Sequence, residues 1–243
     1  MLEEWIKFLR SCSPCVCLLL IGVFTTGAVA ADPVYLNSPT GAERFGRSAV
    51  NSSALSVLRY AETERHQSFC GPTSLAIAMN SLGINDPTPP SLFPYHLATQ
   101  DTVFTPPNQA IKSYEEVERS GLALNQLAQF ANNLNLSASV LHAADLSAAD
   151  MRERLLAAIG RPDSRVIVNF FRGSLGQEGG GHFSPLVAYD PASDSFLILD
   201  VARYKYPPVW ASFKDLDVSM RTMDPDTGLS RGALIVTRST APN

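Results

Sequence analysis

The order in which helical and strand-like patterns follow one another most limits the fold of this chain. Apolar residues recur at helical spacing in the first two thirds of the chain, at 71–82, 122–134 and 147–160. Runs rich in β-branched and aromatic residues follow, at 165–171, 182–189, 195–201 and 233–237. Helices followed by strands indicate an α+β fold, because a parallel α/β sheet needs the two to alternate. We expect an N-terminal helical part packed on a C-terminal antiparallel sheet.

The segments around these elements are predicted to be less regular. Residues 31–52 are rich in small and polar residues and are interpreted as an extended arm, and 54–64 as a short helix. Residues 85–109 carry six prolines. Because proline removes a backbone donor and clashes with the preceding helical turn, this segment cannot form a long helix and is predicted to be a covering loop.

The first 30 residues are typical of an export signal. An apolar run at 15–24 follows a start that carries two bases, and Ala28-Val29-Ala30 supplies the small residues that a signal peptidase reads. We expect cleavage after Ala30, leaving residues 31–243 as a single periplasmic or secreted domain without stable membrane association. The alternative is an uncleaved anchor, although the run is shorter than the ~20 residues of a spanning helix.

Charge and cysteine content narrow the classes of partner. The formal net charge is −4 and no stretch is rich in lysine or arginine, which argues against nucleic acid and anionic membranes. The oligomeric state stays open, a homodimer included. Three of the four cysteines fall in the leader, so Cys70 is the single thiol of the expected mature chain. An unpaired cysteine in an oxidising compartment is usually either deeply buried or used.

Cys70 is the first candidate for chemistry. It directly precedes the helix expected at 71–82, in the segment His-Gln-Ser-Phe-Cys-Gly-Pro-Thr-Ser. Unpaired N–H groups and the positive end of the helix dipole favour a thiolate at such a position. The sequence therefore predicts a nucleophile, with a small buried apolar residue as the alternative.

A nucleophilic cysteine needs an imidazole to exchange its proton and a third group to orient that ring. The expected mature chain offers His66, His96, His142 and His182. His182 follows the triple glycine 179–181, which lets a backbone or a substrate approach closely. His66 competes because it is near Cys70 in sequence, whereas His96 and His142 are interpreted as structural or exposed.

Asp200 is the candidate for the orienting group. If strands 182–189 and 195–201 pair through a turn at 190–194, residues 182 and 200 face each other, since residue 191 lies midway between them. This register predicts that Asp200 lies beside His182. The alternatives are a surface histidine and a turn-forming aspartate. The spacing shows no His-Glu-x-x-His pattern, cysteine pair or calcium loop, so we expect no metal site on the protein itself.

Four segments resemble the phytochelatin synthases. Phe69 to Ser74 with Met79 to Gly83 is similar to the nucleophile helix of that family. Asn169 to Pro185 is similar to its histidine strand, Asp200 to Trp210 to its aspartate segment, and Arg231-Gly232 fits the start of its last strand. The resemblance spans nearly all of residues 55–238.

The resemblance implies a papain-like fold with a triad of Cys70, His182 and Asp200. It implies attack on the Cys–Gly bond of glutathione, loss of glycine, and a γ-glutamylcysteinyl thioester that is hydrolysed or passed to a second glutathione to make phytochelatin. The chain looks like the short bacterial members, which are mainly hydrolases. The expected role is heavy-metal detoxification, with no bound cofactor and with cadmium as an activator or as part of a metal–glutathione substrate. Candidate substrate-binding residues are Gly180, Gly181, Arg203, Lys205 and Arg231.

One position departs from the family pattern. A glutamine usually precedes the nucleophile by six residues as a donor to the oxyanion, and here that residue is Glu64. An ionised carboxylate cannot donate and repels the developing charge. Either Glu64 is protonated, or Gln67 replaces it, or the Cys70 backbone N–H carries more of the stabilisation. The rival functions are a papain-like peptidase acting on other exported peptides and an inactive thiol- or metal-binding homologue.

Overall fold

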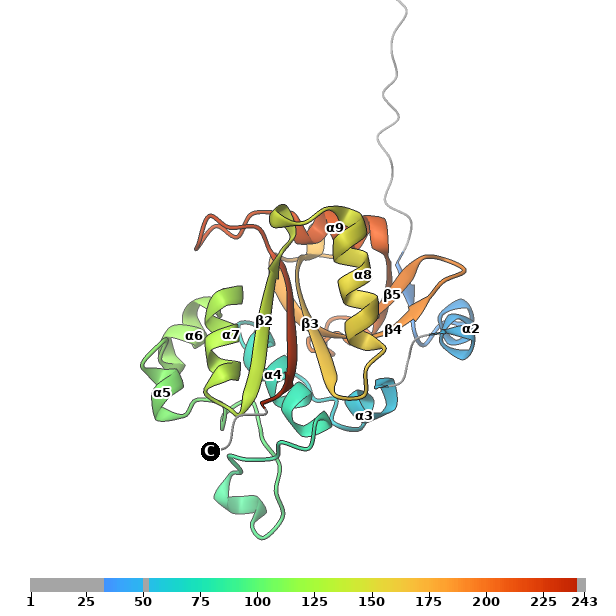
Figure 1. The fold of residues 1–243 in the computed structure, drawn as a ribbon. Coiled ribbons are helices and arrows are strands. Elements are labelled where there is room, and N and C mark those ends of the chain that lie inside the picture. The colour runs from blue at the N-terminus through green and yellow to red at the C-terminus, as the bar shows by residue number, and fades with distance from the viewer. Residues whose placement is uncertain (1–32, 50–52, 240–243) are drawn as a thin grey trace, which may run out of the picture.

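The computed structural model of the chain describes residues 33–49 and 53–239. At its centre, a layer of strands lies between helices (Figure 1). Within the described residues, seven strands form one sheet in which each neighbouring pair is antiparallel. From edge to edge they are β1 (Val34–Tyr35), β6 (Val209–Ser212), β5 (Ser195–Ile198), β4 (Gly181–Asp190), β3 (Ser164–Phe171), β7 (Gly232–Arg238) and β2 (Leu136–His142). The expected α+β class is confirmed. The leader and its cleavage point lie outside the described residues.

Helices cover both faces of the sheet, so its central strands are buried on both sides. Figure 1 shows α8 (Ala148–Ile159) crossing in front of the sheet and α4 (Cys70–Ser81) behind it. Alternate residues of β3 divide between the two layers: Ile167 packs with the α4 side, and its neighbours Val166 and Val168 pack with the α8 side. Further helices are α3 (Ala54–Arg59), α5 (Pro106–Gln109), α6 (Tyr114–Ser120), α7 (Leu124–Asn132) and α9 (Phe213–Met220).

The periodic segments of the sequence form the helices that they predict. The patterns at 71–82, 122–134 and 147–160 correspond to α4, α7 and α8, and the Ser147 side chain caps α8 by accepting from the backbone N–H of Asp150. The helix expected at 54–64 is shorter, since α3 ends at Arg59. Residues 85–109 contain no long helix: the 3₁₀ turn η1 (Pro90–Leu92) and α5 are its helical pieces. This segment does not cover the cavities described below, whose linings it does not enter.

The expectation of an extended arm at 31–52 is wrong for α2 (Pro39–Arg47). Ser38 caps this helix by accepting from the backbone N–H of Gly41, and Pro39 occupies the first helical position, where its missing N–H costs nothing. Gly41 is buried so tightly that a β-carbon there would overlap the carbonyl of Tyr35. Glycine and serine, which weaken a helix on average, are here the residues that start it and let it dock.

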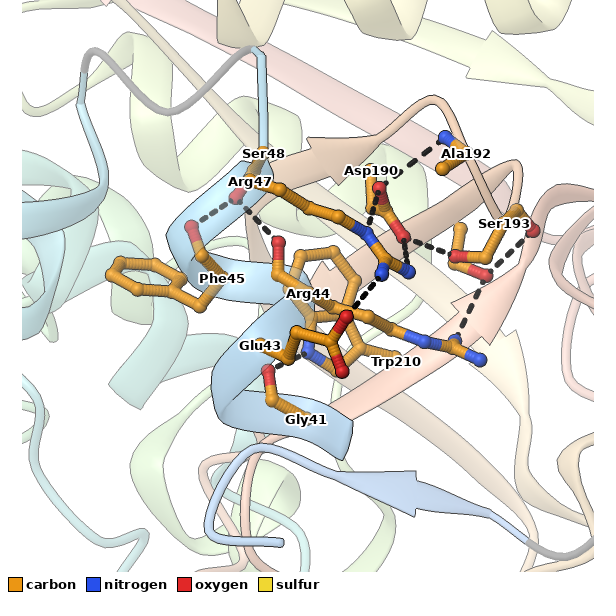
Figure 2. A network of polar contacts seen from close by, with 11 residues as sticks. Gly41, Glu43, Arg44, Phe45, Arg47, Ser48, Asp190, Ala192, Ser193 and Trp210 are labelled. Atoms are coloured by element: carbon orange, nitrogen blue, oxygen red, sulfur yellow. Dashed lines mark hydrogen bonds and ion pairs between the residues drawn. The ribbon is translucent and has the colours of Figure 1, made fainter. Parts of the chain in front are cut away.

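Two arginines of α2 attach it to the turn between β4 and β5 (Figure 2). The Arg47 guanidinium donates to both carboxylate oxygens of Asp190, at 3.0 and 2.9 Å. Arg44 donates to the Ser195 hydroxyl at 3.3 Å, and the Trp210 indole N–H donates to the carbonyl of Gly41 at 3.0 Å. Helix α2 is therefore held to the end of the hairpin that lies farthest from His182.

The β4–β5 hairpin differs in register from the sequence prediction. It closes at the pair Asp190–Ser195, and a bulge between Leu186 and Ala188 shifts the pairing by one residue. Beyond the ladder, Val201 N–H donates to the Ser184 hydroxyl at 3.3 Å, so the chain after β5 lies further along than expected. The predicted facing of residues 182 and 200 along the backbone is wrong, although their side chains still meet.

Several elements in the less patterned stretches were not predicted. Helix α6 has a capping box, in which Ser113 and Glu116 each bind the other's backbone N–H, and this Ser-x-x-Glu signal is visible in the sequence. Strand β6 and helix α9 follow the segment that begins at Asp200. In the part of the chain that the structure describes, no helix combines the length and apolarity needed to span a bilayer.

Candidate active site

Cys70 is the first residue of α4 and is buried beneath the strand that carries His182. Its side chain is 7 % exposed, and it is the one free cysteine of residues 33–49 and 53–239. Gly71 and Pro72 continue the first turn, where proline is tolerated because no intrahelical donor is required. Since α4 is buried along almost its whole length, the position of the Cys70 sulfur is fixed by the core.

The structure brings the three predicted triad residues together. His182, near the start of β4, is 4 % exposed, and its Nε2 lies 3.0 Å from Oδ1 of the fully buried Asp200. A ring nitrogen of His182 lies within 4.8 Å of the Cys70 sulfur. The edge of the imidazole also packs against Phe170, which fixes the plane of the ring. The side chains therefore form a buried chain from sulfur to imidazole to carboxylate.

Arg172 completes this chain and was missed by the sequence analysis. Its guanidinium donates to both oxygens of Asp200, at 2.7 and 2.9 Å, and to Oε1 of Gln177 at 2.7 Å. Burial alone would raise the pKa of Asp200, but hydrogen bonds from His182 and Arg172 hold it well below its usual range. Arg172 directly follows the apolar strand 165–171, and an arginine that is buried at the end of such a strand needs an anionic partner.

Burial keeps the sulfur and the imidazole neutral before any substrate binds. It raises the pKa of the Cys70 thiol to about 12, with the nearby Glu64 as the second cause, although hydrogen bonds from the backbone of Phe183 and Gly71 oppose the rise. Burial also lowers the pKa of His182. The thiolate expected at a helix N-terminus is therefore not the resting form, because desolvation outweighs the dipole. A neutral imidazole beside a thiol can accept its proton as the sulfur attacks.

Glu64 lies against the sulfur and the imidazole, and one of its oxygens has no partner. One of its carboxyl oxygens, the Cys70 sulfur and a nitrogen of His182 all lie within 4.8 Å of one another. Oε1 accepts from the Tyr204 hydroxyl at 2.7 Å, whereas the buried Oε2 has no hydrogen-bond partner among the described residues. Burial raises the pKa of Glu64 to about 7, against the hydrogen bond from Tyr204. A substantial fraction of this carboxyl is thus neutral near pH 7.

Two cavities flank the reactive sulfur and meet at Gln67 and Gly181. The larger, of about 510 Å³, is lined by Cys70 itself, Asn169 and Arg231 among others. The smaller, of about 300 Å³, is lined by residues on the imidazole side, which include Glu64, His182, Gly180, Tyr204 and Lys205. Gln67 lines both, so it lies near the reacting atoms, and among the described residues no hydrogen bond commits its side chain to another role.

The candidate cations for substrate binding separate into two groups. Arg231 is 7 % exposed at the wall of the larger cavity, 3.6 Å from Asp224, and its buried Nε has no partner among the described residues. A β-carbon at Gly181 would overlap its guanidinium, so the glycine makes room for this arginine. Lys205 lines the smaller cavity and donates to the carbonyl of Glu178 at 2.8 Å.

Arg203 is not brought to the site. It lines neither cavity, and its guanidinium donates to the carbonyl of Ala61 at 3.1 Å. The competing histidines also have other partners. His66 lies at the rim of the larger cavity with Nε2 3.3 Å from Glu118, and the remaining two pair with Asp86 and with the carbonyl of Ser230.

Comparisons with known proteins agree with this geometry. A family model described as phytochelatin synthase matches residues 24–233. Glutathione gamma-glutamylcysteinyltransferase 3 of Lotus japonicus is 30% identical over 182 residues, which are 75% of this chain and 37% of that protein. Glutathione gamma-glutamylcysteinyltransferase 1 of Triticum aestivum is 31% identical over 188 residues, 77% of this chain and 36% of that protein. The relative in Schizosaccharomyces pombe is 29% identical over 174 residues, 72% of this chain and 41% of that protein. The chain thus spans about two fifths of the length of these curated relatives.

Proposed function

The chain belongs to the phytochelatin synthase family, and from this premise we propose that it is a glutathione γ-glutamylcysteinyltransferase with glutathione hydrolase activity. The observation that carries the proposal is the buried alignment of Cys70, His182 and Asp200. We propose further that residues 31–243 act as one papain-like catalytic domain after loss of the leader.

The first half of the reaction replaces a peptide bond with a thioester. The Cys70 sulfur forms a bond to the carbonyl carbon of the cysteinyl residue of glutathione while its proton passes to His182. Asp200, itself held by Arg172, orients the ring and stabilises the imidazolium. When the C–N bond breaks, His182 returns the proton to the leaving amine, and glycine departs from a γ-glutamylcysteinyl thioester on Cys70.

The second half returns the enzyme to its starting state. Water attacks the thioester to give γ-glutamylcysteine, or the amino group of a second glutathione attacks it to give the shortest phytochelatin. In either case His182 accepts a proton from the nucleophile and passes it to the Cys70 sulfur as the C–S bond breaks. Because both routes share one acyl-enzyme, the same side chains support hydrolysis and transfer.

Glu64 acts in this proposal as a neutral carboxylic acid that donates to the oxyanion, together with the backbone N–H of Cys70 at the start of α4. Its unpartnered Oε2 and its raised pKa, about 7, support a proton on that oxygen. An acid in this form can donate to developing charge, whereas its ionised form cannot. Gln67, which lines both cavities, is the alternative donor.

Arg231 and Lys205 are the proposed partners of the glutathione carboxylates, one in each cavity. The free Nε of Arg231 supports this role, because a guanidinium binds a carboxylate through two parallel donors. Gly180 leaves open space for the substrate beside the start of β4, and Gly181 makes room for Arg231. We also propose that cadmium takes part as an activator or as its glutathione thiolate, that the enzyme is exported, and that a homodimer is a state to be tested.

Replacement of the nucleophile tests the function most directly. Cys70→Ala should abolish glycine release from glutathione and leave the fold intact, because one buried sulfur is lost. The measurement is mass spectrometry of the products with and without cadmium, and the acyl-enzyme should add the mass of γ-glutamylcysteine to Cys70. Full activity of Cys70→Ala would end the proposal. Cleavage of α-linked peptides with glutathione untouched would identify a peptidase of different specificity.

The export proposal has its own test. The protein purified from the periplasm or the medium of an expressing cell should begin at Ala31. The measurement is N-terminal sequencing with fractionation of membranes. A membrane-bound protein that begins at Met1 would show that the leader is an anchor.

A further inference from the structure

The cluster around the Cys70 sulfur contains three kinds of metal ligand in one buried place. A thiol, an imidazole and a carboxyl group come from a helix, a strand and a loop, and their nearest ligand atoms lie within 4.8 Å of one another. We propose that Cys70, His182 and Glu64 bind one free thiophilic divalent cation, zinc or cadmium, and that this binding blocks the reaction centre, whereas cadmium that takes part in turnover is carried as its glutathione thiolate. The binding stands by itself, and the block rests on the proposed function.

The separation of the three atoms fits a metal ion with small movements. At the outer limit of 4.8 Å, the centre of an equilateral triangle lies about 2.8 Å (4.8/√3) from each corner. Zinc bonds to sulfur at about 2.3 Å and to nitrogen or oxygen at about 2.0–2.2 Å, so the side chains have to move inward by at most about 0.5–0.8 Å. Three protein ligands also leave a fourth tetrahedral position for water or for the thiol of glutathione.

His182 and Glu64 each present a ligand atom that the surrounding structure leaves available. Asp200 holds one nitrogen of His182, and this is the carboxylate–imidazole contact that orients metal-binding histidines. The Tyr204 hydroxyl holds Oε1 of Glu64, and Oε2 is without a partner among the described residues although the side chain is 3 % exposed. The supporting contacts that a metal site needs are therefore already made.

The chemistry of the ligands selects the cation. Thiolate and imidazole prefer zinc and its softer relatives, whereas magnesium and calcium prefer oxygen ligands alone. On binding, the Cys70 thiol and the protonated Glu64 carboxyl each give up a proton to solvent, so two negative ligands neutralise the doubly charged ion. The sulfur lone pair and the imidazole nitrogen that the acyl transfer needs are then both occupied.

The site was not predicted from the sequence because its ligands are far apart in the chain and follow no metal-binding spacing. Glu64 is the residue that turns the catalytic pair into a three-ligand set. A glutamine in its place would offer a neutral amide oxygen, which is a poorer ligand than a carboxylate for a cation. A glutamate in place of the usual glutamine thus makes the activity of this chain sensitive to free metal.

The test measures metal binding without turnover. It uses the full chain with its three leader cysteines replaced, so that Cys70 is the single thiol, by Cys12→Ser, Cys15→Ser and Cys17→Ser. Titration with cadmium should produce the ultraviolet thiolate charge-transfer band, saturating at one equivalent. Cys70→Ser should remove the band, and Glu64→Gln should weaken binding by about tenfold or more.

Glu62→Gln is the matched control. Glu62 is a nearby glutamate whose pKa burial also raises to about 7, but it is not a member of the ligand cluster. It should bind cadmium as the unsubstituted chain does. Equal affinity in Glu64→Gln, or a band that persists in Cys70→Ser, would overturn the site, and circular dichroism of each variant checks that it is folded.

A second measurement separates the site from the proposed function. Zinc should stop glycine release when glutathione is not in excess over the metal, so that free zinc remains. A chelator should restore the release, and Glu64→Gln should need about tenfold more free zinc for the same inhibition. One equivalent of bound metal with undiminished turnover would overturn the block. Stoichiometric binding in a chain that never releases glycine would support the site and refute the proposed function.

Discussion

The two ends of the β4–β5 hairpin carry the same chemical pair in different surroundings. At the turn, Arg47 donates hydrogen bonds of 3.0 and 2.9 Å to Asp190. Beyond the open end, Arg172 donates hydrogen bonds of 2.7 and 2.9 Å to Asp200. The arginine side chains differ in exposure, with 40 % for Arg47 and 5 % for Arg172. The geometry of the fork is shared, and access of water is what distinguishes the two pairs.

This difference decides what each pair does. Water reaches the Arg47 guanidinium, although Asp190 is itself buried, so the pair is partly screened and attaches α2 to the turn. The Arg172–Asp200 pair is desolvated, so each charge depends on the other, and the carboxylate stays ionised where burial alone would neutralise it. Glu64 is the contrasting case: it is buried with a tyrosine in place of an arginine, and its pKa rises to about 7.

The largest effect that separates the two ends should be on catalysis. Asp200→Asn should lower kcat/KM for glutathione by about 10⁴, because a neutral amide no longer holds the imidazole in the required tautomer. Asp190→Asn, the same change at the turn, should leave kcat/KM close to that of the unsubstituted chain. The measurement is the rate of glycine release. Similar losses in both variants would show that the hairpin acts as one unit and that the comparison fails.

A second experiment compares the two arginines by stability. Arg172→Met should lower the free energy of unfolding by about 3–5 kcal/mol, because it leaves a buried carboxylate without its main partner. Arg47→Met should cost less, about 1–2 kcal/mol, because water reaches the vacated position and Asp190 keeps bonds from the Ser193 hydroxyl and the Ala192 N–H. Denaturant unfolding followed by circular dichroism measures both. A loss at Arg47 as large as that at Arg172 would contradict the assigned roles.

The smallest effect concerns Glu64 and appears as a pH dependence. Its proton is present below its pKa of about 7 and is lost above it, so glycine release by the unsubstituted chain should fall as pH rises through 7. Glu64→Gln keeps a donor at all pH values and should be several-fold faster above pH 7. Glu62→Gln should show the unsubstituted profile, although the pKa of Glu62 is also raised to about 7.

The same substitution has a signed effect on stability. A carboxyl whose folded pKa is raised stabilises the fold fully below its unfolded pKa, near 4.5, and loses that contribution as pH rises through the folded pKa. The stability advantage of Glu64→Gln should therefore grow between pH 4.5 and 7.

In the rate experiment, an unchanged rate of Glu64→Gln across pH together with a collapse of the rate in Gln67→Ala would make Gln67 the donor.

The reacting residues of the site could be predicted from the sequence better than the residues that hold them in place. Cys70 stands out as a cysteine at the start of a helix, and His182 as a histidine directly after a triple glycine. Both signals lie in the neighbouring sequence, and both indicate nucleophilic catalysis. The Asp200 contact was reached through a wrong register, because the hairpin closes at the pair Asp190–Ser195 and not around residue 191, and the contact holds because the side chains span the shift. The ionisation of Cys70 could not be predicted, since it depends on burial by strands that are distant in sequence.

Arg172 and α2 were missed for related physical reasons. The partner of Arg172 lies in the segment after β5, 28 residues along the chain, so only tertiary structure identifies the arginine as buried and paired. The helix at Pro39–Arg47 has the composition of a loop and is stabilised by docking, through Gly41 against Tyr35 and Arg47 on Asp190. Arg203 shows the converse, because a cation in a segment that resembles a binding region points to a backbone carbonyl elsewhere.

Gly181 has a consequence for how the selectivity of this protein can change. The residue directly precedes His182, and it lies against the guanidinium of Arg231 with no room for a β-carbon. A mutation that places a larger side chain at position 181 displaces Arg231 and, with it, the start of β4, the strand that carries His182. Variants selected for a new carboxylate substrate would thus lose reactivity in the same step, so preference and rate are inherited as one trait.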